Sequence, residues 1–247
     1  MKKAFFFLPG LLVLFLLGAH TAEAMVPLVV VDVRGVKLTP GQSVDGSQPI
    51  TLLEGQQLSL ISPTGKLIKL RGPYAEAPVK DEATEKADVG AAMQALLTQK
   101  VARADRAGVV RGQAGQVVPP EPWLLDVTHP GNRCLPAGGR ITFWRPEGGV
   151  EESLVTTPAD RSWRAQAVWP AQDDRLMLPS SVPLPSRSSY VVKLGKKEVM
   201  LTLLTLPAAL DNDAMRAAWM MEKGCDSQAV ALLQKSQAAP RPAVRKE

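Results

Sequence analysis

The chain has 247 residues and carries 29 lysines and arginines against 24 aspartates and glutamates, a formal net charge of +5. This excess is far from the clustered basic face of a nucleic-acid-binding protein, so nucleic acid is excluded as a partner class. The length allows one or two domains.

Residues 1–24 have the layout of a secretory signal peptide. Lys2 and Lys3 precede an apolar run from Ala4 to Leu17, and the small-x-small triplet Ala22-Glu23-Ala24 follows. The apolar run is shorter than the ~20 residues of a membrane-spanning helix. We therefore expect cleavage after Ala24, export to the periplasm and no stable membrane span afterwards. The alternative is an uncleaved signal that tethers the protein.

Residues 25–78 predict a small β-rich module. A strand is expected at 27–33, and Pro40-Gly41 marks a turn. The β-prone runs 57–61 and 67–72 surround Pro63-Thr64-Gly65, a pattern typical of a β-hairpin with one half-buried face. So small a module buries little apolar surface by itself.

Residues 79–119 change in character to a helix and a linker. Met93, Leu97 and Val101 recur at helical spacing within a helix expected at 87–106. The stretch that follows, from residue 108, is rich in Gly and Pro. This helix is either a connector that docks on one of the units or a partner-binding helix.

Residues 120–208 predict a β-sandwich of immunoglobulin-like size. Short β-prone runs alternate with turn signals, and no helical pattern occurs among them. All five tryptophans lie in the second half of the chain, and for Trp144 and Trp169 we expect core packing rather than a sugar-stacking platform. The expected strands are 123–127, 140–145, 153–157, 165–168, 189–194 and 198–206.

Residues 209–236 predict a helical hairpin, followed by a disordered tail at 237–247. Asp211 or Asp213 is expected to cap the first helix, which ends at Lys223 with Gly224 after it. Asp226 is expected to cap a second helix that ends near residue 236.

The two cysteines, Cys134 and Cys225, are separated by 91 residues. An even count in an exported protein favours a disulfide, and two buried free thiols are the alternative. We place Cys134 in the loop before the 140–145 strand and Cys225 in the turn of the helical hairpin. The bond would then clamp the hairpin onto the sandwich.

The sequence contains no catalytic, cofactor-binding or metal-binding motif. His129, the one histidine after residue 24, precedes Pro130-Gly131, where a surface or loop-bonding role is favoured over general-base catalysis. Paired carboxylates are typical of solvated turns, and a catalytic pair is defined by distances that a sequence does not give. The pairs are Glu151-Glu152, Asp173-Asp174, and Asp211 with Asp213.

The runs 38–43 and 58–73 resemble the β-rich periplasmic domain of FecR-like proteins, in which a Gly-Gln turn precedes strands that end in a Gly-containing hairpin. The overall layout is also similar to uncharacterised secreted proteins of Gram-negative bacteria. FecR regulators carry a transmembrane helix and a cytoplasmic arm, which we do not expect here. The resemblance therefore implies a periplasmic binding or scaffolding role rather than signal relay.

Together these patterns predict a mainly β protein with some α: a small N-terminal β module, a connector helix, an immunoglobulin-like β-sandwich and a C-terminal helical hairpin. We expect a non-enzymatic interaction, scaffold or sensor module of the cell envelope, with a protein partner and no cofactor. The alternatives are an envelope hydrolase that uses carboxylates and a glycan-binding protein.

Overall fold

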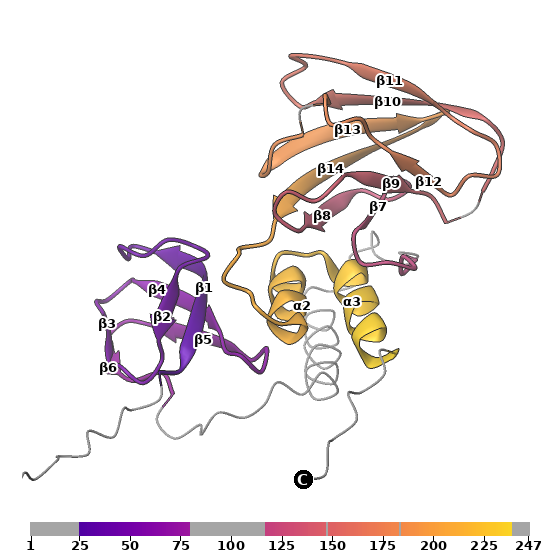
Figure 1. The fold of residues 1–247 in the computed structure, drawn as a ribbon. Helices are drawn as coiled ribbons and strands as arrows, with labels where there is room; N and C mark the ends of the chain where they lie inside the picture. The colour runs from indigo at the N-terminus through magenta and orange to yellow at the C-terminus, as the bar shows by residue number, and fades with distance from the viewer. Residues whose placement is uncertain (1–24, 80–116, 147, 183, 239–247) are drawn as a thin grey trace, which may run out of the picture.

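The computed structural model describes residues 25–79, 117–146, 148–182 and 184–238 (Figure 1). The protein is mostly β, with two C-terminal helices that form a hairpin, as the sequence predicts. The expected signal peptide, the connector helix at 87–106 and residues 239–247 of the expected tail lie outside the described residues.

The first β unit contains two small sheets. One has the strand order β2-β1-β4-β5, and β3 pairs with β6 in the other. The predicted hairpin is confirmed, since β4 and β5 pair antiparallel around a turn in which Gly65 N–H donates to the carbonyl of Ser62. The strands are β1 (Pro27–Arg34), β2 (Ser43–Asp45), β3 (Ile50–Leu52), β4 (Gln57–Ile61), β5 (Leu67–Arg71) and β6 (Tyr74–Glu76).

Strand β1 presents apolar side chains on both faces of the four-stranded sheet. Side chains alternate between the faces of a strand, so Leu28 and Val30 join the core of the first unit. Val29 and Val31 point the other way and pack in a core with both helices. The first unit therefore buries the apolar face that contains Val29 and Val31 by packing against the helical hairpin.

The second β unit is a sandwich of a five-stranded sheet, β11-β10-β13-β14-β8, and a three-stranded sheet, β12-β9-β7. Its core is built around the fully buried Trp169 and Phe143. Most pairs are antiparallel, but β14–β8 and β7–β9 are parallel. The strands are β7 (Leu124–Asp126), β8 (Gly131–Leu135), β9 (Thr142–Trp144), β10 (Glu152–Pro158), β11 (Ala165–Trp169), β12 (Arg175–Met177), β13 (Ser188–Leu194) and β14 (Lys197–Thr205).

In the second unit, the structure contains two strands, β8 and β12, besides the six that the sequence predicts there. Cys134 therefore lies in a strand, and its placement in a loop was wrong. The polar residues at the start of β8, after Pro130, are typical of a loop. Strand β8 pairs with β14, which is distant in sequence, so no hairpin pattern next to β8 indicates a strand. β12 has only three residues, two of them exposed, so its alternation is too short to detect.

The helices are α2 (Asp213–Glu222) and α3 (Asp226–Ala238). Asn212 caps α2, and not Asp211 or Asp213: its extended backbone lets the side-chain oxygen accept the Met215 N–H at 2.9 Å. Gly224 follows α2 with φ +76°, the left-handed conformation expected of that position. The second helix runs two residues beyond its predicted end.

The predicted disulfide joins Cys134 in β8 to Cys225 between the helices, with Cα atoms 6.0 Å apart. Beside it, the Gln228 side chain of α3 is only 1% exposed. Its Oε1 accepts the Cys134 N–H at 2.8 Å, and its Nε2 donates to the Cys134 carbonyl at 2.9 Å. Nε2 also donates to the Pro122 carbonyl at 2.8 Å, so one amide joins α3 to two segments of the sandwich unit.

The first β unit docks beside α2, as Figure 1 shows. Asn212 Nδ2 donates to the Pro63 carbonyl at 3.1 Å, and Lys223 Nζ donates to the Val31 carbonyl at 3.2 Å. Gly65 packs so closely on α2 that a Cβ there would lie 2.8 Å from the Ala214 carbonyl oxygen. The turn of the β4–β5 hairpin is thus fitted to the helix.

We expect Gln228→Leu to lower the free energy of unfolding by about 2–4 kcal/mol, because it leaves buried backbone groups of Cys134 and Pro122 without partners. The measurement is the midpoint of urea unfolding. Gln234→Leu is the matched control, since Gln234 lies exposed on the same helix. Equal midpoints for both variants would contradict the role given to Gln228.

Replacing both cysteines by alanine should lower the free energy of unfolding by about 2–5 kcal/mol, because the bond restricts the unfolded chain across 91 residues. Chemical denaturation of the oxidised wild type and the double variant measures the difference. Wild type alkylated under denaturing conditions should gain label only after reduction. Two labelled thiols without reductant would contradict the bond.

Candidate functional site

One carboxylate of each pair in the sequence forms an ion pair with an arginine. Glu152 Oε2 is 3.1 Å from Arg145 Nη1, and Asp213 Oδ1 is 3.0 Å from Arg216 Nη1. Asp174 pairs with Arg175 at 3.6 Å. Four cavities in the described part of the chain are each lined by at most one carboxylate. These cavities therefore offer no carboxylate pair for acid–base chemistry.

His129 belongs to a hydrogen-bonded loop. Its Nδ1 lies 2.8 Å from Asp126 Oδ2, and the Thr128 hydroxyl donates to Asp126 Oδ1. The buried Arg133 donates to the carbonyls of Asp126 and His129. Burial lowers the pKa of the Arg133 guanidinium, and the Asp126 carboxylate offsets part of that shift. These contacts fix the path of the chain between β7 and β8.

The tryptophans are mainly core residues. Trp144 and Trp169 are buried, as the sequence predicts, and Trp219 is buried between the helices and the first unit. Arg145 lies over the Trp169 ring, 5.0 Å from its centroid. Trp163 is only half-buried, and it borders a cavity.

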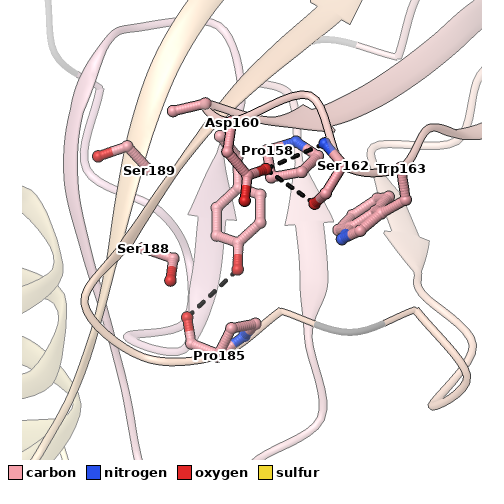
Figure 2. A pocket seen from close by; sticks show the side chains of 9 residues that line it. Pro158, Asp160, Ser162, Trp163, Pro185, Ser188 and Ser189 are labelled. Atoms are coloured by element: carbon pink, nitrogen blue, oxygen red, sulfur yellow. Dashed lines mark hydrogen bonds between the residues drawn. The ribbon is translucent and has the colours of Figure 1, made fainter.

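We call this cavity of about 300 Å³ the aromatic pocket; it is formed by the 158–163 turn and by residues 185 and 188–190 (Figure 2). The Trp163 and Tyr190 ring centroids are 6.1 Å apart, with the rings tilted by 43°. The 158–163 turn lies beside β13 because β10 pairs with β13, which places Pro158 opposite Tyr190. The pocket therefore has one aromatic ring from the turn and one from strand β13.

Asp160 is the one charged side chain that lines the aromatic pocket. Its Oδ1 accepts hydrogen bonds from the Ser162 backbone N–H at 3.0 Å and the Ser162 hydroxyl at 2.8 Å, as Figure 2 shows. These bonds hold the pKa of Asp160 below its ordinary value, so the carboxylate is ionised at neutral pH. Burial raises the pKa of Tyr190, whose hydroxyl donates to the Pro185 carbonyl.

A second cavity, of about 730 Å³, adjoins the first; we call it the apolar groove. It lies along residues 138–141, 177–180, 182, 184 and 185, and Pro185 lines both cavities. Met177, which is 57% exposed, forms one wall at the end of β12, the outer strand of the three-stranded sheet. The pocket and the groove share Pro185, and we call the two together the binding surface.

Another cavity, of about 280 Å³, lies between the first unit, the hairpin and the second unit. It is lined by Asp32, Trp219 and Lys223 among others. Lys223 already bonds the Val31 carbonyl, so its ammonium helps to join the units. We therefore assign this cavity to the junction rather than to ligand binding.

No protein-family model matches the sequence, and no curated protein matches it. Among the described residues, no three His, Cys, Asp or Glu side chains form a group that could hold a metal ion. No helix in the described part of the chain is long and apolar enough to cross a membrane.

Sequence reasoning missed the binding surface. Asp160 and Trp163 lie in the turn after β10, whereas Tyr190 lies in β13, and only the pairing of β10 with β13 brings them together. One local signal was present: the Asp-x-Ser spacing at 160–162, which is typical of an Asx-turn.

Ser162→Ala should raise the pKa of Asp160 towards its ordinary value of 3.8, because one hydrogen bond to the carboxylate is lost. Since the folded-state pKa is depressed, the turn gains stability above the unfolded-state pKa and loses it as the pH falls through the folded-state pKa. Carboxyl NMR shifts followed against pH measure this. Ser189→Ala is the control, since the Ser189 hydroxyl bonds Thr202 instead. An unchanged pKa in Ser162→Ala would contradict the assignment.

Proposed function

We propose that this protein is a non-enzymatic binding module of the cell envelope that holds a protein partner on the binding surface of its second β unit. The observation that carries the proposal is the continuity of the aromatic pocket with the apolar groove at Pro185. Concave, mainly apolar sites with a few placed polar groups are typical ligand sites. The outer position of β12 along the groove also suits an extended peptide, which binds beside sheet edges.

Export to the periplasm is part of the proposal. The signal-like sequence of residues 1–24 favours it, and the disulfide between Cys134 and Cys225 suits an oxidising compartment. Both features agree with an exported protein.

The way in which the two β units are joined supports the proposal of a scaffold or sensor role. The helical hairpin contacts both units through one core and holds them in a fixed relation. The FecR-like sequence of the first unit favours a periplasmic binding or scaffolding role for that unit too. We infer that the protein presents two surfaces from one rigid body.

Glycan binding is the second candidate, because Trp163 beside Asp160 and several serines resembles a sugar subsite in composition. The 43° tilt between Trp163 and Tyr190 gives no flat platform for a sugar ring, so we rank this candidate below a protein partner. A carboxylate hydrolase ranks lower again, since the aromatic pocket contains Asp160 alone.

A photo-crosslinking residue placed at Met177 should trap one discrete protein partner in intact cells, because this side chain forms a wall of the groove. The matched control is Val168, which is 59% exposed on β11, the outer strand of the other sheet, and does not line the groove. Mass spectrometry of the adduct that is present only at residue 177 identifies the partner.

Identical adducts at both positions, or none at residue 177, would contradict a protein-binding groove. Fractionation of the same cells tests the compartment. Recovery of the protein in the osmotic-shock fluid supports export, whereas recovery only in the membrane pellet would contradict a soluble periplasmic protein.

A further inference from the structure

The aromatic pocket combines a fixed negative charge with the half-buried ring of Trp163, and the Tyr190 ring beside it is 2% exposed. Asp160 Oδ1 accepts both Ser162 hydrogen bonds, and no described residue bonds its other oxygen, Oδ2. The faces of aromatic rings carry negative partial charge and attract cations. Both elements of the pocket therefore favour the same kind of ligand group.

We propose that the aromatic pocket binds the cationic side chain of an arginine or lysine in an extended partner segment, while neighbouring apolar residues of that segment lie in the groove. This inference rests on the proposed function and names the chemistry of the partner. The pocket volume of about 300 Å³ suits one long side chain rather than a folded surface.

The same unit already contains such a contact within its own fold. The Arg145 guanidinium lies 5.0 Å from the Trp169 ring centroid and pairs with the Glu152 carboxylate at 3.1 Å. The aromatic pocket presents the same two partners, an indole and a carboxylate, with no described arginine lining it. A basic side chain from outside would complete an equivalent arrangement.

The charges around the pocket are mixed, and this makes the proposal testable. Arg161 follows Asp160 in sequence, Arg164 follows Trp163, and Arg187 lies between Pro185 and Ser188; all three are exposed, but none lines the pocket. If they dominated the local field, an anionic side chain would bind better than a cationic one. A sugar would bind without regard to charge.

The test is an NMR titration of the purified protein that follows the indole N–H signals of its tryptophans. The probes are N-acetyl-arginine amide, its neutral isostere N-acetyl-citrulline amide, N-acetyl-glutamate amide and methyl glucoside. We expect saturable shifts of the Trp163 signal with the arginine probe, with a dissociation constant on the order of 1 mM. The Trp169 indole, which donates to the Asp173 carbonyl, is the internal reference.

Asp160→Asn should raise the dissociation constant of the arginine probe by about threefold, because the amide oxygen keeps the Ser162 bonds while the charge is lost. Asp174→Asn is the control, since Asp174 pairs with Arg175 outside the pocket. Higher salt should weaken the same binding. Equal binding of citrulline and arginine, preference for glutamate or glucoside, or no effect of Asp160→Asn would overturn the inference.

The outcomes separate this inference from the proposed function. If residue 177 traps a partner but Asp160→Asn binds arginine as wild type does, the groove stands and the cation site is wrong. If arginine binds as expected but residue 177 traps nothing, the cation site stands and the protein-binding function is wrong.

Discussion

The rest of the structure depends on how Cys134 is held. Its sulfur is bonded to Cys225, and its backbone N–H and carbonyl both bond the Gln228 side chain. A disulfide restricts the unfolded chain, whereas the amide satisfies backbone groups that burial would otherwise leave unpaired. The two act on different states of the protein, so together they fix the hairpin to β8 by independent means.

This attachment lets the short helical hairpin support the first β unit. Two helices of 10 and 13 residues are marginal without tertiary packing. Once fixed to β8, their other faces meet Val29, Val31 and Ile61 of the first unit in one core. The first unit, itself too small to bury much surface, is thereby stabilised by a helix that the second unit positions. Loss of the disulfide would therefore also weaken the packing of the first unit on the hairpin.

The sequence predicted the local features well. The β4–β5 hairpin was located because the signals for both strands and the turn lie within 15 consecutive residues. The helical hairpin was found from its caps, although Asn212, and not a neighbouring aspartate, bonds the helix. The cysteine pair followed from compartment chemistry. The features that were missed are non-local. β8 is defined by its parallel pairing with β14, and the aromatic pocket by the pairing of β10 with β13, which brings the 158–163 turn beside residues 185 and 188–190.

The residues that hold the units together lie apart from those that line the aromatic pocket. The clamp is buried and lies at β8, whereas Asp160 and Trp163 lie on a turn after β10, held by local hydrogen bonds to Ser162. A site on short, hydrogen-bonded loops at the ends of paired strands loses little conformational entropy on binding, because its backbone is already ordered. Trp163 also packs against the core of the second unit, so a substitution there would disturb that core. A substitution of Asp160, which is exposed, would change the charge of the aromatic pocket and leave the core intact.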